Sequence, residues 1–491
     1  MSRKFPRITT LLKAIAVLFV ASSVWFLWIL RAPPPMPFPD PGGVFKNVVL
    51  ILPGERRSPP VDIVIEGKRI LAVTPTQEGQ VNGYVLPGLV DAHVHGPILP
   101  LPGHDALFAL LYLYHGITLV REAAGDAQLR NDIAAGKFPG PIVLTCGPFL
   151  DGEPPDWRGS LVVVDEASAR SAVTEVIAGA FDCIKVYNNL TTEASAAIHL
   201  AAREAGLPVI GHVPWRQDFA DAHIDDLQHV VGWAPFQPDD ASIPHVRRLL
   251  GMADLDQERI DWLVQRAADR DFQLTPTLIT LHRKFSLGDA DALAQRPSAA
   301  LLPRFYRQQL WHPSRGLVSA RLLNEADHRQ FETAFAQALS AVGALHEAGI
   351  ELHSGTDSPA EFIVPGAGLW EELRLLTDAG LSPEQALAVS TVGTRKRLLP
   401  TAEAPLSQGA LADFVVFSRD PTEDLARLDS LSAVVVEGRI YSREQMEQTL
   451  RRYQAWFNSP AYRRVTETMV GLGLGLINTF SGSQEPTPPP S

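Results

Sequence analysis

The chain has 491 residues, of which 46% are hydrophobic and 20% are charged, so it can bury a large core. This composition excludes collagen, coiled-coil and globally disordered proteins, and the two cysteines exclude a disulfide-rich scaffold or a cysteine-based zinc module. The net charge is −12, and because residues 1–31 carry five bases and no acids, the other 460 residues carry −17. We therefore expect no nucleic-acid partner, because phosphate binding needs a basic surface.

The N-terminal region contains a run of 17 uncharged residues, Ala14–Leu30. This length is near the lower limit for a helix that spans a bilayer, and the preceding bases predict a cytoplasmic N-terminus. The run ends in bulky aromatic residues and lacks a small-residue cleavage site, so we expect residues 1–31 to form an uncleaved signal anchor. A cleaved signal peptide and a buried helix are the alternatives. The anchor predicts a membrane protein whose folded part is exported to the periplasmic or extracellular face.

The segments that flank the body differ in composition from it. Residues 32–43 contain six prolines, which predicts an extended spacer. At the other end we expect a helical extension over residues 446–480 and a disordered tail over residues 481–491.

Short strand-like runs bounded by glycine and proline occur at both ends of the body. They predict one discontinuous β-sandwich domain, built from residues 44–86 and 405–445. Its expected strands are 45–52, 61–66, 67–73, 84–86, 412–417, 433–437 and 439–441.

Between these segments, residues 87–404 alternate apolar strand candidates with helical stretches. Eight such alternations predict an α/β fold, a (β/α)8 TIM-like barrel, whose active site lies at the carboxyl ends of its strands. The expected strands are 88–95, 116–122, 142–146, 183–187, 209–212, 226–230, 273–277 and 350–356. Insertions at 239–264 and 281–328 are expected to form helices over the barrel mouth.

Ligand-type side chains lie at the ends of five of these strands. They are His93 and His95, Lys185, His212, His229 and Asp357. A period of two places His93 and His95 on one face of their strand. Any one of these residues alone has a structural alternative, such as a buried core histidine or, for Asp357, a helix N-cap. Their joint placement instead favours a divalent metal site, because imidazole and carboxylate are good ligands.

The motifs PGLVDAHVH, IKVY, GHVP, QH and GTDSP, in this order, resemble those of the amidohydrolase superfamily. The segments NVVLI…VDIVIEGKRILAV and GALADFVVFSRDP…LSAVVVEGRIYS resemble the beginning and end of the same family. The resemblance covers residues 44–445. Within the superfamily it is closest to imidazolonepropionase-like proteins, which include Xaa-Pro dipeptidases.

The resemblance implies a centre of two divalent metal ions, with zinc expected. His93, His95 and Asp357 would hold one ion, and His212 and His229 the other. Lys185, converted by CO2 to a carbamate, would bridge both. A metal-activated hydroxide would attack an amide carbonyl while Asp357 moves the proton.

Two further residues are expected to contact the substrate. Tyr187 follows Lys185 by two residues on the same strand face, with a packed core tyrosine as the alternative. His353 shares a strand face with Asp357. In the QH motif, Gln228 stands where the family usually has glutamate, and we expect it to tune its neighbour His229.

The function predicted from these residues is a hydrolase that cleaves amide carbon–nitrogen bonds of small peptides or cyclic amides, in the manner of an Xaa-Pro dipeptidase. A mononuclear deaminase and a non-enzymatic scaffold of the same fold are the alternatives. The exact substrate and the metal stay undetermined, and a homo-oligomer is left open. Cys146 and Cys183 each lie in a predicted strand, and we expect buried free thiols, with pairing as the alternative.

Overall fold

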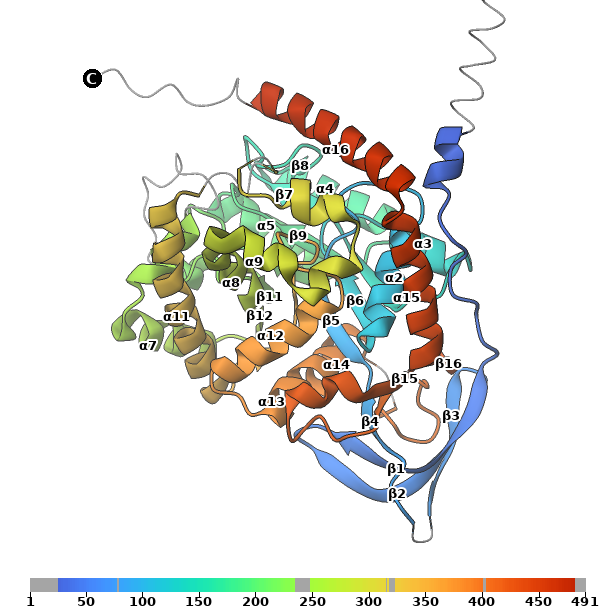
Figure 1. Ribbon diagram of the computed structural model, residues 1–491. Coiled ribbons are helices and arrows are strands. Elements are labelled where there is room, and N and C mark those ends of the chain that lie inside the picture. The colour runs from blue at the N-terminus through green and yellow to red at the C-terminus, as the bar shows by residue number, and fades with distance from the viewer. Residues whose placement is uncertain are drawn as a thin grey trace, which may run out of the picture.

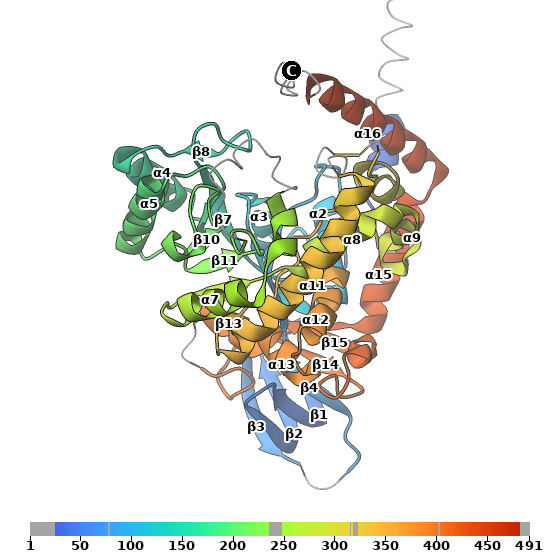
Figure 2. The ribbon, with the colours of Figure 1, turned by 90° about the vertical axis from the view of Figure 1, so that its left-hand side faces the viewer.

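The computed structural model describes residues 25–76, 79–234, 248–314, 316–317, 323–400 and 403–481. Helices surround a large curled sheet, and a second sheet extends from one end of this body (Figure 1). The view turned by 90° shows the same arrangement, with β1, β2 and β3 at the end away from α16 (Figure 2). The molecule is therefore an α/β body with an attached sheet.

The attached sheet has seven strands in the order β16-β15-β14-β4-β1-β2-β3. The strands are β1 Gly42–Leu52, β2 Arg56–Glu66, β3 Arg69–Pro75, β4 Gly83–Pro87, β14 Phe414–Phe417, β15 Leu431–Val436 and β16 Arg439–Ser442. Along β1, Val48 and Leu50 pack in a cluster that belongs to this sheet, whereas Val49 and Ile51 pack in the main core. This alternation follows from the two-residue period of a strand, and it buries both faces of β1.

The two ends of the body pair as predicted for one discontinuous domain, and the β-sandwich form of that domain stays a prediction. Strand β4 pairs in parallel with β1 and antiparallel with β14, so the early and late strands lie edge to edge. They form one hydrogen-bonded sheet that folds back on itself, because the Ile70 amide of β3 donates to Ala410 O, just before β14, at 2.9 Å. Side chains from the early and late strands pack in one cluster inside it.

The large sheet is parallel, and each of its strands pairs with the next along the chain. The strands are β5 Leu89–Val94, β6 Ile117–Glu122, β7 Ile142–Asp151, β9 Cys183–Val186, β10 Val209–Gly211, β11 Asp226–Gln228, β12 Gln273–Thr275 and β13 Glu351–Leu352, with β8 Leu161–Val162 pairing beside β7. The segment after β13 returns to β5, where the Ala92 amide donates to Ser354 O at 2.8 Å. This curled parallel sheet is consistent with a TIM-like barrel, and all eight strands predicted for it are present.

Helices follow most of the parallel strands and cover the outside of the sheet (Figure 1). Several begin at a residue whose side chain accepts an amide of the first turn, such as Asp165 before α4 and Ser442 before α15. The helices are α2 His104–Tyr114, α3 Gln128–Ala134, α4 Glu166–Ala178, α5 Thr192–Ala205, α7 Gln257–Ala268, α8 Leu278–Ser286, α9 Ala290–Gln295, α11 Glu325–Glu347, α12 Ala367–Asp378, α13 Pro383–Ala388, α14 Thr394–Leu398, α15 Arg443–Phe457 and α16 Pro460–Ser481.

The insertion predicted at residues 281–328 contains helical turns in its described part and packs near the end of β13. Trp311 is fully buried there, and its Nε1 donates to Pro359 O at 3.0 Å. Trp311 also contacts the ring of Phe362, with centroids 5.3 Å apart. This insertion therefore holds the loop that follows Asp357. In the first insertion, residues 239–247 lie outside the described residues.

Within the described part of the chain, none of the helices combines the length and apolar character needed to cross a bilayer. Residues 1–24 of the predicted anchor are not among the described residues, so the anchor stays a prediction. Residues 25–30 form a short helix, and the Trp456 indole donates to Ile29 O at 3.1 Å, which fixes this helix to α15. The predicted helical extension corresponds to α15 and α16, while residues 482–491 of the predicted tail also lie outside the described part.

The expectation of two free thiols is wrong, because Cys146 and Cys183 form a disulfide. The two residues are register partners on the adjacent strands β7 and β9, with Cα atoms 4.4 Å apart. That separation lies within the range that a disulfide bridges. The bridge is buried in a small cluster with Ala123 and Ile210.

Candidate metal centre

The end of β5 and the loop after β13 bring the first predicted ligands together. The amides of Thr356 and Asp357 donate to the carbonyl oxygen of His93 at 3.2 and 2.7 Å. Asp357 has a left-handed φ of 61°, which is uncommon for a residue with a side chain. In this conformation its Oδ1 lies 2.8 Å from Nε2 of His95 and 3.4 Å from Nε2 of His93.

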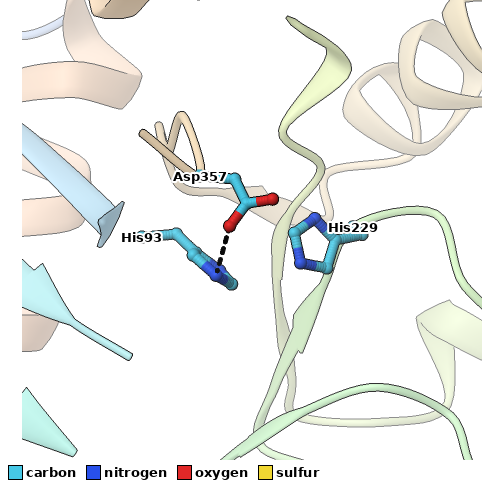
Figure 3. Close-up of side chains that lie close together, drawn as sticks. All are labelled: His93, His229 and Asp357. Atoms are coloured by element: carbon cyan, nitrogen blue, oxygen red, sulfur yellow. Dashed lines mark ion pairs between the residues drawn. The ribbon is translucent and has the colours of Figure 1, made fainter. Parts of the chain in front are cut away.

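His229, which follows β11, completes a group of three metal-ligating side chains. One ligand atom from each of His93, His229 and Asp357 lies within 4.8 Å of the others (Figure 3). His229 also has a left-handed φ, 62°, and its amide donates to Thr275 O at 2.8 Å. This group contains members of both predicted ligand sets, so the two sets adjoin one another.

His212 and Lys185 lie beside this group on the neighbouring strands. The His212 ring centroid is 5.0 Å from that of His229, and β9, which carries Lys185, pairs with β10, which precedes His212. Lys185 is 1% exposed, and its Nζ has no hydrogen-bond partner among the residues that the structure describes. Such an orphaned polar atom in a native core calls for a partner that the protein chain does not supply.

Each of the four predicted histidine ligands has an oxygen atom beside its Nδ1. His93 Nδ1 hydrogen-bonds Gln228 Oε1, His212 Nδ1 lies 2.8 Å from Asn188 Oδ1, and His229 Nδ1 hydrogen-bonds Thr277 Oγ1. His95 Nδ1 is 3.6 Å from Glu122 Oε1. A histidine whose Nδ1 donates to an oxygen presents an unprotonated Nε2, and this is the usual arrangement of a metal-bound imidazole.

The ionisation of the group follows from its burial and its contacts. Burial alone would raise the pKa of Asp357, but its contacts with the rings of His93 and His95 outweigh burial and hold this pKa well below its usual value. Burial lowers the pKa of Lys185 to about 7 and that of His93 to about 4. For His95, the neighbouring carboxylates of Asp357 and Glu122 overcome burial and raise the pKa to about 9. A neutral amine on Lys185 is therefore accessible near neutral pH.

Tyr187 lies beside His212, with ring centroids 4.5 Å apart. Its ring stacks on Phe149 at 4.7 Å, and its hydroxyl accepts a hydrogen bond of 2.9 Å from Nε1 of Trp157. Trp157 is itself 56% exposed, so these aromatic side chains extend from the histidines to the surface.

His353, the second predicted substrate contact, has its contacts elsewhere. It is 1% exposed, and its Nδ1 lies 3.2 Å from Asp226 Oδ2, a carboxylate that also pairs with Arg121. Its Nε2 lies 3.7 Å from Glu351. These contacts place His353 in a buried charge network, and its substrate role stays a prediction.

The residues that supply the oxygen atoms beside the histidines were mostly not predicted from the sequence. Gln228 was expected to tune His229, its chain neighbour, but it bonds His93 instead. Glu122, Asn188 and Thr277 carry no signal beyond lying at or next to a predicted strand end. Their pairing depends on loop conformations that the strand pattern does not define.

Comparisons with known proteins agree with this architecture. No family model matches the chain. Uncharacterized proteins of Mycobacterium tuberculosis and Mycobacterium bovis are each 22% identical over 366 residues, covering 73% of this chain and 86% of theirs. Among solved structures, bottromycin amidohydrolase is similar with a TM-score of 0.71 and 22% identity, covering 87% of this chain and 92% of that one.

Two further solved structures come from the dipeptidase group. A Xaa-Pro dipeptidase with methionine in its active site has a TM-score of 0.56 and 19% identity, covering 81% of this chain and 99% of that one. A prolidase complexed with N-methylphosphonate-L-proline has a TM-score of 0.57 and 19% identity with the same coverages. The chain thus has the fold of amidohydrolases and Xaa-Pro dipeptidase-like proteins, which confirms the predicted resemblance at the level of the fold.

Proposed function

We propose that this chain is a metal-dependent hydrolase that cleaves amide carbon–nitrogen bonds of small peptides or cyclic amides, as an Xaa-Pro dipeptidase-like member of the amidohydrolases. The observation that carries the proposal is a group of four histidines with an oxygen atom beside each Nδ1: His93, His95 and His229 lie beside Asp357, and His212 lies beside His229. The shared fold with amidohydrolases and a prolidase supports it.

The side chains fit two divalent ions, with zinc expected, because the donors are imidazoles, a carboxylate and an orphaned buried amine. His93, His95 and Asp357 would hold one ion and His212 and His229 the other. Lys185, whose amine loses its proton near pH 7, would add CO2 and bridge them as a carbamate. When bound, such ions acidify water and polarise a carbonyl group.

Side chains of the protein would then move the proton, position the ligands and stabilise the oxyanion. Asp357 is ionised, since its pKa lies well below the usual value, and it would accept a proton from water and pass it to the leaving nitrogen. His95 Nε2 lies 2.8 Å from Asp357 Oδ1, so these two proposed ligands of the first ion already lie side by side. The Tyr187 hydroxyl would donate a hydrogen bond to the developing oxyanion.

The test is hydrolysis by the purified full-length chain of a panel of Xaa-Pro and other dipeptides, N-acyl amino acids and lactams. Removal of metal by a chelator should abolish turnover, and zinc should restore it. Lys185→Ala should abolish turnover and lower the bound metal, whereas Lys68→Ala, at an exposed ion pair with Glu437, should change neither.

Full activity in the metal-free protein would contradict the proposal. Release of ammonia with the deaminated product, together with one ion per chain, would favour the deaminase alternative. A chain that binds no metal and hydrolyses none of the panel would favour the scaffold.

A further inference from the structure

Glu372 on α12 is a fully buried carboxylate whose described hydrogen-bond partners are backbone amides. Its Oε1 accepts from the Leu278 amide at 2.9 Å, and its Oε2 accepts from the Ile279 amide at 2.8 Å. These amides are the first two of α8, and amides at a helix start have no acceptor within the helix. Glu372 thus caps a helix that lies more than 90 positions away in the chain.

The residue that would ordinarily cap α8 is Thr277, which directly precedes it. A threonine at this position usually turns its hydroxyl back to accept an amide of the first turn. Thr277 makes no such bond, and its backbone is left-handed, with φ 45° and ψ 50°. This conformation is strained for a β-branched residue and must be held by its surroundings.

With the amides satisfied by Glu372, the Thr277 hydroxyl is turned toward His229, where its Oγ1 hydrogen-bonds Nδ1. One arrangement of the hydrogens satisfies all three of these groups. Thr280 gives its hydroxyl hydrogen to Thr277 O at 2.8 Å, so Thr280 Oγ1, 3.5 Å from Thr277 Oγ1, can accept but not donate there. Thr277 can therefore donate to Thr280 and accept the Nδ1 hydrogen of His229.

We propose that Glu372 is a positioning residue for the metal centre: by capping α8 in place of Thr277, it releases the Thr277 hydroxyl to hold His229 as the Nδ1-protonated tautomer. The unprotonated Nε2 is then the ligand atom. The part of this inference that concerns metal affinity rests on the proposed function. The tautomer of His229 can be measured without metal and does not depend on that function.

The experiment compares Glu372→Gln with Glu371→Gln in the full-length chain. The glutamine offers one acceptor for two amides, so Thr277 should turn back to cap α8. Glu371, the matched control on the same helix, pairs with Arg283 and Arg296 and does not contact Thr277. Two measurements are made: imidazole 15N shifts of His229 in metal-free protein, assigned with a His229→Asn variant, and zinc affinity by competition with a chelator.

In Glu372→Gln we expect His229 to shift from the Nδ1-protonated form toward a tautomer mixture, and zinc to bind about 10- to 100-fold more weakly. Thr277→Val should reproduce both effects without touching Glu372, and Thr277→Ser should restore the native signals. If Glu372→Gln does not fold, Thr277→Val still tests the inference, because an unchanged His229 tautomer in that variant would rule out the hydrogen bond that Glu372 is proposed to make possible.

Unchanged His229 shifts in Glu372→Gln and Thr277→Val would overturn the inference, as would equal shifts in Glu371→Gln. If the wild-type chain binds no zinc but the His229 shifts respond as expected, the proposed function fails while the positioning role stands.

Discussion

At the scale of single residues, Tyr187 joins an interior histidine to an exposed aromatic side chain. An indole N–H can only donate, so the Tyr187 oxygen is the acceptor in its 2.9 Å bond with Trp157. Burial raises the pKa of Tyr187 well above its usual value. The hydroxyl therefore keeps its hydrogen across the physiological pH range and can act as a donor.

Replacement of Tyr187 by phenylalanine should lower kcat about 100-fold, which is the usual cost of one lost oxyanion donor. The bound metal should not change, since the phenol is not one of the expected ligands. Steady-state kinetics on the best substrate of the panel, with metal analysis of the same sample, measures both. Tyr453→Phe, in the buried face of α15, is the control. Equal kcat in Tyr187→Phe and wild type would remove Tyr187 from the reaction.

The ligand-type residues could be predicted from the sequence because each lies at the end of a strand, and parallel strands end at one edge of a sheet. Their hydrogen-bond partners could not be predicted in the same way. Gln228 is 135 positions from His93, and Thr277 is 48 positions from His229. The second pair also depends on a left-handed backbone at Thr277, which a β-branched residue rarely adopts.

At the scale of elements, one buried histidine connects two helices that are distant in the chain. His104 begins α2, and its Nε2 lies 3.0 Å from the Tyr462 hydroxyl on α16. The His104 ring also stacks on Phe305 with centroids 5.8 Å apart. Burial lowers the pKa of His104 to about 3, so the folded protein keeps this ring neutral in mild acid.

This lowered pKa predicts a loss of stability in acid. Between about pH 6.5 and pH 3 the unfolded chain binds a proton at His104 that the folded chain does not, so the free energy of unfolding falls as pH falls. The contribution is about 1.4 kcal/mol per pH unit. Urea denaturation from pH 4 to pH 6 should show this slope reduced by about that amount in His104→Gln. Tyr462→Phe should keep the slope, because it leaves the ring buried. An unchanged slope in His104→Gln would refute the assignment.

The positions of strands could be predicted wherever the sequence had a clear two-residue period, as in β1 and β5. What covers each face of β1 could not be predicted, because alternation along β1 reports two buried faces but not their partners. One face contacts the main core, and the other packs in a cluster with Phe414 and Val435 of the late strands.

At the scale of the whole molecule, the disulfide is informative about the cellular compartment in which the chain folds. Cys146 and Cys183 close a loop of 37 positions across β7 and β9, two residues before Lys185. Disulfides of this kind form in oxidising compartments and are rare in the cytosol. We therefore propose, together with the predicted anchor, that the folded part of this chain is exported.

Closing a loop of this length should stabilise the fold by about 4 kcal/mol, mainly by restricting the unfolded chain. The variant Cys146→Ala/Cys183→Ala should lose that amount in urea unfolding. Alanine suits the surrounding apolar cluster of Ala123 and Ile210. The protein isolated from its native membrane fraction should give no free thiols after denaturation. The protein made in a reducing cytosol should give two free thiols, and its urea midpoint of unfolding should be lower. Two thiols in the native material would contradict export, and equal stability of the variant would show that the bridge adds nothing to the fold.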